Sequence, residues 1–186
     1  MVLVLDFGSQ YTQLIARKIR ELGVFSEIVP HDISLARVKK KAPGAIILSG
    51  GPQSVYEEGS PHISADIFQL GVPVLGICYG LQLMAHLLGG KVAPSARREY
   101  GFALLKVARR GGLLRGVRSK SQVWMSHGDQ VGSLPPGFIA SGVTANCETA
   151  VVENRKEALF GVQFHPESIL CEDGKKIIKN FLEGKH

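Results

Sequence analysis

Short apolar runs alternate with helix-like segments over the first ninety residues, and this alternation restricts the fold more than any other feature. The runs lie at residues 2–5, 24–29, 45–48 and 72–75. Each has the length of one buried strand. Helix-like segments follow at residues 10–22, 33–41, 66–70 and 79–88. Because strand and helix take turns, the sequence predicts a mainly parallel sheet with helices on both of its faces.

After Gly90 the pattern changes to short strand-like runs separated by turn signals. These runs lie at residues 100–107, 122–125, 138–141, 150–152 and 159–164. They predict antiparallel hairpins that extend the sheet or form a small second one. A closing helix is expected over residues 173–182. No linker or repeat interrupts the chain, so we expect one domain of mixed α/β structure over residues 1–186.

Composition restricts location and partners. No apolar run approaches the roughly 18 residues of a membrane span, and the N-terminus lacks the basic region of a signal peptide. We therefore expect no membrane association. Three widely spaced cysteines do not form a disulfide framework, which favours a cytoplasmic location.

The net charge of +6 raises the question of nucleic acid. Basic residues are scattered except at residues 39–41 and 91–120, and no nucleic-acid motif accompanies them. We expect no nucleic-acid partner. The stretch 91–120 is either a surface for a protein partner or an ordinary solvated face.

A cysteine stands at the junction between the fourth run and its helix. The sequence Gly76-Ile77-Cys78-Tyr79-Gly80 has the Gly-x-nucleophile-x-Gly pattern of a nucleophile elbow. Such a turn strains the backbone of its central residue, exposes its side chain and directs it at a helix N-terminus, which favours a thiolate. We therefore predict that Cys78 is a nucleophile. The alternative is a small buried cysteine that fills space.

A thiolate nucleophile needs a base, and the base needs an orienting partner. His165 follows the strand-like run 159–164, and Glu167 lies two residues further, on the same side of an extended backbone. Glu167 would then orient His165. A packed histidine is one alternative, and His127 is a rival base. His165 and Glu167 could also be metal ligands, but no third ligand at useful spacing appears, so no metal site is expected.

A tetrahedral oxyanion needs two fixed N–H donors. The backbone N–H that follows the nucleophile belongs to Tyr79. The second donor is expected from the glycine-rich loop Gly50-Gly51-Pro52, and Gly51 is the candidate. A simple turn is the alternative for that loop.

These motifs resemble the class I (triad) glutamine amidotransferases over nearly the whole chain. The segments that carry the resemblance are residues 50–52, 76–82 and 164–167. Within the family, residues 6–15, 99–101 and 124–129 are similar to the amidotransferase part of GMP synthetases. One departure concerns Ser168-Ile169-Leu170, which resembles the anthranilate or aminodeoxychorismate synthase branch.

The resemblance implies that Cys78 attacks the side-chain amide of L-glutamine and that a thioester is then hydrolysed to glutamate. It also implies that Gln82 binds the substrate and that the backbone at Gly128 and Asp129 holds the α-amino and α-carboxylate groups. No cofactor is expected in this chain.

In GMP synthetases the ammonia passes to adenylylated XMP in an ATP-pyrophosphatase domain. The chain has no Ser-Gly-Gly-x-Asp-Ser signature, so ATP, Mg and XMP are expected on an ATP-pyrophosphatase subunit or domain. Two alternatives stay open. One is the amidotransferase subunit of a chorismate-using synthase, and the other is a catalytically silent regulatory module on the same fold.

Overall fold

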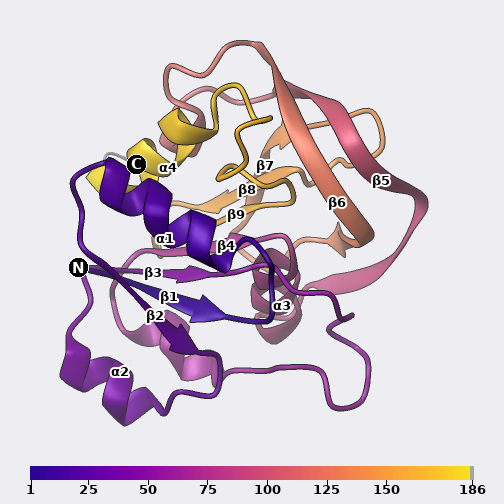
Figure 1. Cartoon of the computed structure of the whole chain (residues 1–186). Coiled ribbons are helices and arrows are strands. Elements are labelled where there is room, and N and C mark those ends of the chain that lie inside the picture. Colours follow the sequence, from indigo (N-terminus) through magenta and orange to yellow (C-terminus); the bar gives the residue numbers. More distant parts are fainter. Residues whose placement is uncertain (185–186) are drawn as a thin grey trace.

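The computed structural model describes residues 1–184, which form a nine-stranded mixed sheet with helices on both faces (Figure 1). The strand order is β2-β1-β3-β4-β9-β8-β7-β5-β6. The strands are β1 (Val2–Asp6), β2 (Ser26–Pro30), β3 (Ala45–Leu48), β4 (Val74–Ile77), β5 (Lys91–Val107), β6 (Lys120–Ser133), β7 (Ile139–Val143), β8 (Val151–Asn154) and β9 (Leu159–Val162). The α-helices are α1 (Thr12–Glu21), α2 (Leu35–Lys41), α3 (Tyr79–Leu87) and α4 (Gly174–Glu183).

The sheet divides the apolar core into two layers. Along β1, Val2 and Val4 pack with α1 and α4, whereas Leu3 and Leu5 pack with α2 and α3. Side chains alternate between the faces of a strand, so a strand covered on both sides must be apolar throughout. This requirement explains the continuous apolar runs in the sequence and confirms the predicted fold class.

Strand β9 enters the sheet beside β4 and joins its parallel half to its antiparallel half. The parallel register pairs Val74 with Leu159 and Ile77 with Val162. The carboxyl ends of both strands therefore meet at one edge of the sheet, where ligands bind in open α/β folds. The segments that follow these strands carry Cys78 and His165.

The hairpin of β5 and β6 is much longer than the sequence predicted. Strand β5 begins at Lys91 rather than at residue 100, and β6 runs on to Ser133 rather than ending at residue 125. Residues 91–98 of β5 are mostly exposed, so burial gives them no apolar periodicity. The pairing is also irregular between Pro94 and Glu99.

Smaller differences concern the helices. Helix α1 starts at Thr12 rather than at residue 10, and the Ser9 hydroxyl accepts a hydrogen bond from the Tyr11 N–H just ahead of the helix. The expected helix near residues 66–70 is a 3₁₀ helix over Ala65–Gln69. Within residues 1–184, no helix combines the length and apolar character needed to cross a bilayer.

Candidate active site

The elbow has the strained geometry that its sequence predicts. Cys78 adopts φ 52° and ψ −108°, an unfavourable region for a residue with a Cβ. Gly80 lies in the first turn of α3, and a Cβ there would come 2.3 Å from the carbonyl oxygen of Leu48 in β3. Only glycine therefore fits where α3 packs against the sheet. The packing of strand against helix therefore forces Cys78 into the turn.

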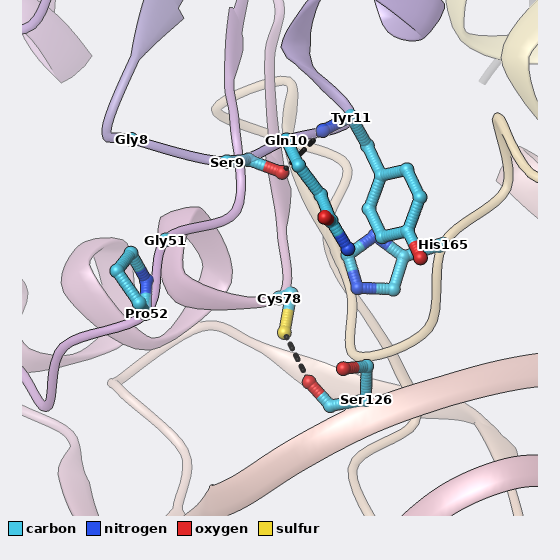
Figure 2. Close-up of a pocket in the computed structure, with 9 residues that line it drawn as sticks. All are labelled: Gly8, Ser9, Gln10, Tyr11, Gly51, Pro52, Cys78, Ser126 and His165. Carbon is cyan, nitrogen blue, oxygen red and sulfur yellow. Dashed lines mark hydrogen bonds between the residues drawn. The ribbon is translucent and has the colours of Figure 1, made fainter.

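The Cys78 side chain is less exposed than a bare elbow predicts, because two groups cover it. Only 5% of Cys78 is exposed. Its sulfur lies 3.5 Å from the carbonyl oxygen of Ser126 (Figure 2). It also lies 3.5 Å from the side-chain amide nitrogen of Gln163. Gln163 precedes His165 by two residues, and sequence reasoning missed its contact with the thiol.

His165 and Glu167 form a buried pair beside Cys78. The Nδ1 atom of His165 lies 2.8 Å from Oε1 of Glu167, which is completely buried. Strand β9 ends at Val162, so the two residues stand in a turn rather than on the extended backbone that we expected. The turn is closed by a hydrogen bond from the Ser168 N–H to the His165 carbonyl, which keeps both side chains together.

The surroundings of His165 favour its protonated form. Burial lowers the pKa of His165, but its hydrogen bonds to Cys78 and Glu167 and the nearby negative charge outweigh burial and raise the pKa to about 10. The Tyr11 ring packs against the imidazole with a centroid distance of 4.8 Å (Figure 2). The surroundings therefore favour an imidazolium beside Cys78, held between a carboxylate and an aromatic ring.

Both ring nitrogens of the rival base, His127, are engaged by other groups of the protein. Its Nε2 atom lies 3.1 Å from the Glu99 carboxylate, and its Nδ1 atom lies 2.9 Å from the Asp129 carbonyl oxygen. Both partners are acceptors, and His127 is buried between them. This arrangement favours His165 as the base. The contacts of His127 hold the segment 127–129 in position.

The glycine-rich loop lies next to Cys78. A Cβ on Gly50 would come within 3.4 Å of the His165 ring and 3.6 Å of the Cys78 Cβ. Gly51 is packed so tightly that a Cβ would lie 2.6 Å from the Phe7 carbonyl oxygen. Tyr79 begins α3 directly after Cys78. The two expected oxyanion donors, Gly51 and Tyr79, thus belong to segments that flank the sulfur.

Two cavities meet at Cys78. The first has a volume of ≈ 270 Å³ and is shown in Figure 2. It is lined by Gly8, Ser9, Gln10, Tyr11, Gly51, Pro52, Cys78, Ser126 and His165. The second, which we term the polar cavity, has a volume of ≈ 440 Å³ and extends from Cys78 past Gln82, Gly128 and Asp129. The structure therefore brings the expected catalytic and substrate-binding residues to one place.

The polar groups of Gln82 and Asp129 are already engaged with the protein. The Gln82 amide nitrogen donates to the Asp129 carbonyl at 2.9 Å and to the Gln163 side-chain oxygen at 3.2 Å. The Asp129 carboxylate accepts hydrogen bonds from the hydroxyls of Ser54 and Tyr56. These residues hold the walls of the polar cavity in position. Within residues 1–184, no group of three or more His, Cys, Asp or Glu side chains is arranged to hold a metal ion.

A cysteine elbow and a histidine–carboxylate pair, each in the segment that follows one of two neighbouring parallel strands, have the arrangement of a thiol-dependent site of the triad type. The comparisons with known proteins agree with this class. The model of the family glutamine amidotransferase class-I matches residues 3–184, and the chain belongs to this family.

Two of the similar proteins are GMP synthases. The chain is 53% identical to a GMP synthase (glutamine-hydrolyzing) of Natranaerobius thermophilus over 182 residues, which are 98% of this chain and 36% of that protein. It is 51% identical to the enzyme of the same name from Aquifex aeolicus, again over 98% of this chain and 36% of that protein. The chain thus spans about a third of the length of these curated relatives.

Solved structures show the same fold. A crystal structure from Thermoplasma acidophilum, described as that of a GMP synthase subunit, superposes with a TM-score of 0.89 at 31% identity and covers 98% of this chain and 92% of that chain. A glutamine amidotransferase from Thermotoga maritima superposes with a TM-score of 0.76 at 20% identity, covering 98% of this chain and 96% of that one. The second likeness concerns the fold alone.

Proposed function

We propose that this chain is the glutamine-hydrolysing component of a GMP synthase, acting as one amidotransferase domain over residues 1–186. The observation that carries the proposal is the buried His165–Glu167 pair, joined at 2.8 Å, beside the strained Cys78 elbow. A catalytically silent module would have no need to keep a strained cysteine next to an imidazolium.

The geometry supports a two-step reaction. The Cys78 thiolate attacks the side-chain carbonyl carbon of glutamine, and the N–H groups of Gly51 and Tyr79 stabilise the oxyanion. The His165 imidazolium gives its proton to the departing nitrogen, so ammonia leaves and a thioester remains. Neutral His165 then takes a proton from water, whose hydroxide attacks the thioester and releases glutamate. Glu167 orients His165 throughout.

The acceptor of ammonia would lie outside this chain. The Natranaerobius and Aquifex relatives are about three times as long as the matched segment, which supports a further synthetase domain or subunit that binds ATP, Mg and XMP. The names of these relatives favour this partner over a chorismate-using synthase, to which only Ser168-Ile169-Leu170 points. We place the component in the cytoplasm, since Cys78, Cys147 and Cys171 are all free thiols.

A coupled assay tests the proposal. Purified chain is mixed with glutamine and with either a GMP synthase ATP-pyrophosphatase or an anthranilate synthase large subunit, each with its own substrates. We expect glutamate formation to be tied to GMP formation only. Coupling to anthranilate formation instead would reject the assignment, and the absence of any glutamate release in either mixture would favour the silent module.

The His165 pKa predicts how the activity depends on pH. A pKa raised to about 10 keeps the imidazolium across the neutral range, and the acid that protonates the leaving nitrogen is lost only as pH rises through that value. In Glu167→Gln the carboxylate that helps to raise this pKa is absent. We therefore expect the alkaline limb of the kcat/KM profile to move to lower pH in Glu167→Gln. An unmoved limb would show that another group controls it.

The isolated chain is expected to hydrolyse glutamine slowly and to be activated by its partner. The Gly50–Gly51 peptide can rotate to supply or withhold an oxyanion donor, because glycine accepts either conformation. One such donor contributes about 10²–10³ in rate. Steady-state kinetics with and without the synthetase component, ATP and XMP should show a rise of that size in kcat. Full activity without the partner, or activation confined to KM, would contradict this gating.

A further inference from the structure

We propose that the outer face of the β5–β6 hairpin docks the synthetase component, and that the matching surface of that component is apolar with carboxylates at one end. The inference rests on the proposed function, which supplies the partner. The apolar part of this face, which we term the outer patch, consists of Phe102, Leu104, Trp124, Ile169 and Leu170. None of these five residues lines either cavity at Cys78.

The outer patch exposes large apolar side chains where a hairpin normally carries polar ones. Phe102 and Leu104 are 61% and 47% exposed, whereas Leu105, which points to the other face of β5, is fully buried. Trp124 lies directly opposite Phe102 on β6, and the two rings meet edge to face with centroids 5.2 Å apart. The solvated face of an antiparallel pair is usually polar, and a contiguous exposed apolar patch marks an interaction site.

The segment that follows the catalytic pair extends the patch. Ile169 is 91% exposed and Leu170 is 38% exposed. The Leu170 carbonyl accepts a hydrogen bond from the Gln122 side chain of β6 at 3.4 Å, which holds this segment beside the hairpin. Trp124, Ile169 and Leu170 also line a groove of ≈ 370 Å³ whose opposite wall is helix α1. A partner therefore meets a continuous apolar surface with a groove that can accept a side chain.

Two ammonium groups at one end of this face indicate the charge of the partner. The register places Lys106 of β5 directly opposite Lys120 of β6, and both side chains are exposed. Like charges in opposite positions destabilise a hairpin, and among the described residues no carboxylate pairs with either lysine. By contrast, Arg17 and Lys18 beside the groove are both paired with Glu21. Carboxylates of a partner would relieve the repulsion at Lys106 and Lys120.

The synthetase component fits this surface better than a second copy of the chain. A second copy that presented the same face would bring further ammonium groups rather than carboxylates. The hairpin also adjoins the place where ammonia is released, because the His165 N–H donates to the Trp124 carbonyl at 3.0 Å and the Ser126 carbonyl of β6 lies at the Cys78 sulfur. A synthetase docked here would receive ammonia before water protonates it.

Binding measurements test the apolar part of the proposal. A GMP synthase ATP-pyrophosphatase is immobilised, and binding of the chain is followed by biolayer interferometry with ATP and XMP present. Phe102→Ala and Ile169→Ser should each raise Kd about tenfold or more, mainly through faster dissociation, as truncation of an interface anchor does. The matched control is Phe25→Ala, which should leave Kd unchanged. Phe25 is 66% exposed but precedes β2, at the opposite edge of the sheet.

Charge reversal tests the carboxylates of the partner. The double variant Lys106→Glu, Lys120→Glu should associate about tenfold more slowly at low salt, because it repels the acidic groups that steer the wild type. Added salt should slow association of the wild type and have little effect on the double variant. Lys39→Glu with Lys40→Glu reverses two exposed charges on α2, on the other side of the molecule (Figure 1), and should associate like the wild type.

The isolated variants show whether a loss of binding reflects a loss of structure. The probe 6-diazo-5-oxo-L-norleucine, an electrophilic analogue of glutamine, should label Cys78 in every variant at the wild-type rate, because none of the substituted residues lines the cavities at Cys78. Thermal unfolding of Ile169→Ser should also match the wild type, since this side chain is almost fully exposed.

Three results would overturn the docking surface. The first is equal affinity of Phe102→Ala, Ile169→Ser and Phe25→Ala for the synthetase, and the second is unchanged association of the double lysine variant. The third is a wild-type dimer in sedimentation experiments that Phe102→Ala dissociates, which would assign the outer patch to a second copy. Failure of the proposed function looks different: the wild type would bind the synthetase through the outer patch and release no glutamate.

Discussion

Replacing Cys78 with alanine should lower the rate of glutamate release by about 10⁴-fold or more, since loss of a triad nucleophile leaves only the contribution of binding and the oxyanion donors. The fold should survive, because the elbow depends on Gly76 and Gly80 rather than on the thiol. Glutamate release with the synthetase partner present measures the first effect, and thermal unfolding measures the second.

The other two cysteines provide the control. Burial raises the pKa of Cys147 to about 11 and that of Cys171 to about 12, so both remain unreactive thiols at neutral pH. Cys147→Ala and Cys171→Ala should therefore keep glutaminase activity, and a glutamine-like electrophile should modify only Cys78. Modification at Cys147 or Cys171 would disprove the assignment of the nucleophile.

The second large effect concerns the pair that activates Cys78. His165→Ala removes the proton donor and should cost about 10⁴-fold or more in kcat, as loss of a triad base does. Glu167→Gln keeps an oxygen opposite Nδ1 and removes only the charge, so its loss should be smaller. It also puts an amide in a buried site where the second carboxylate oxygen has no hydrogen-bond partner among the described residues.

Coupling between the two residues can be measured directly. Glu167 acts through His165, so in the double variant its substitution should cause little further loss. Turnover of wild type, both single variants and the double variant gives the coupling. A double loss equal to the product of the single losses would mean that Glu167 acts independently of His165, and the proposed orienting role would be wrong.

Features that depend on residues close together in the chain were predictable from the amino-acid sequence. The apolar runs at residues 2–5 and 45–48 coincide with strands β1 and β3, because strands buried on both faces must be apolar along their length. The Cys78 elbow was predictable because its two glycines, strand and helix lie within a few residues. The closeness of His165 and Glu167 was predictable for the same reason, although a turn rather than a strand produces it.

Contacts between segments that are far apart in the chain became visible only in the folded structure. Periodicity states that β9 is a strand but not that it lies beside β4, the pairing that brings His165 to Cys78 and places Gln163, 85 residues away, on the sulfur. The exposed half of β5 has no apolar period, so its extension was invisible in the sequence. A local hydrophobic pattern reports burial along one segment of the chain. The site depends on contacts between distant segments, and these contacts are determined by how the strands of the whole sheet pair and pack.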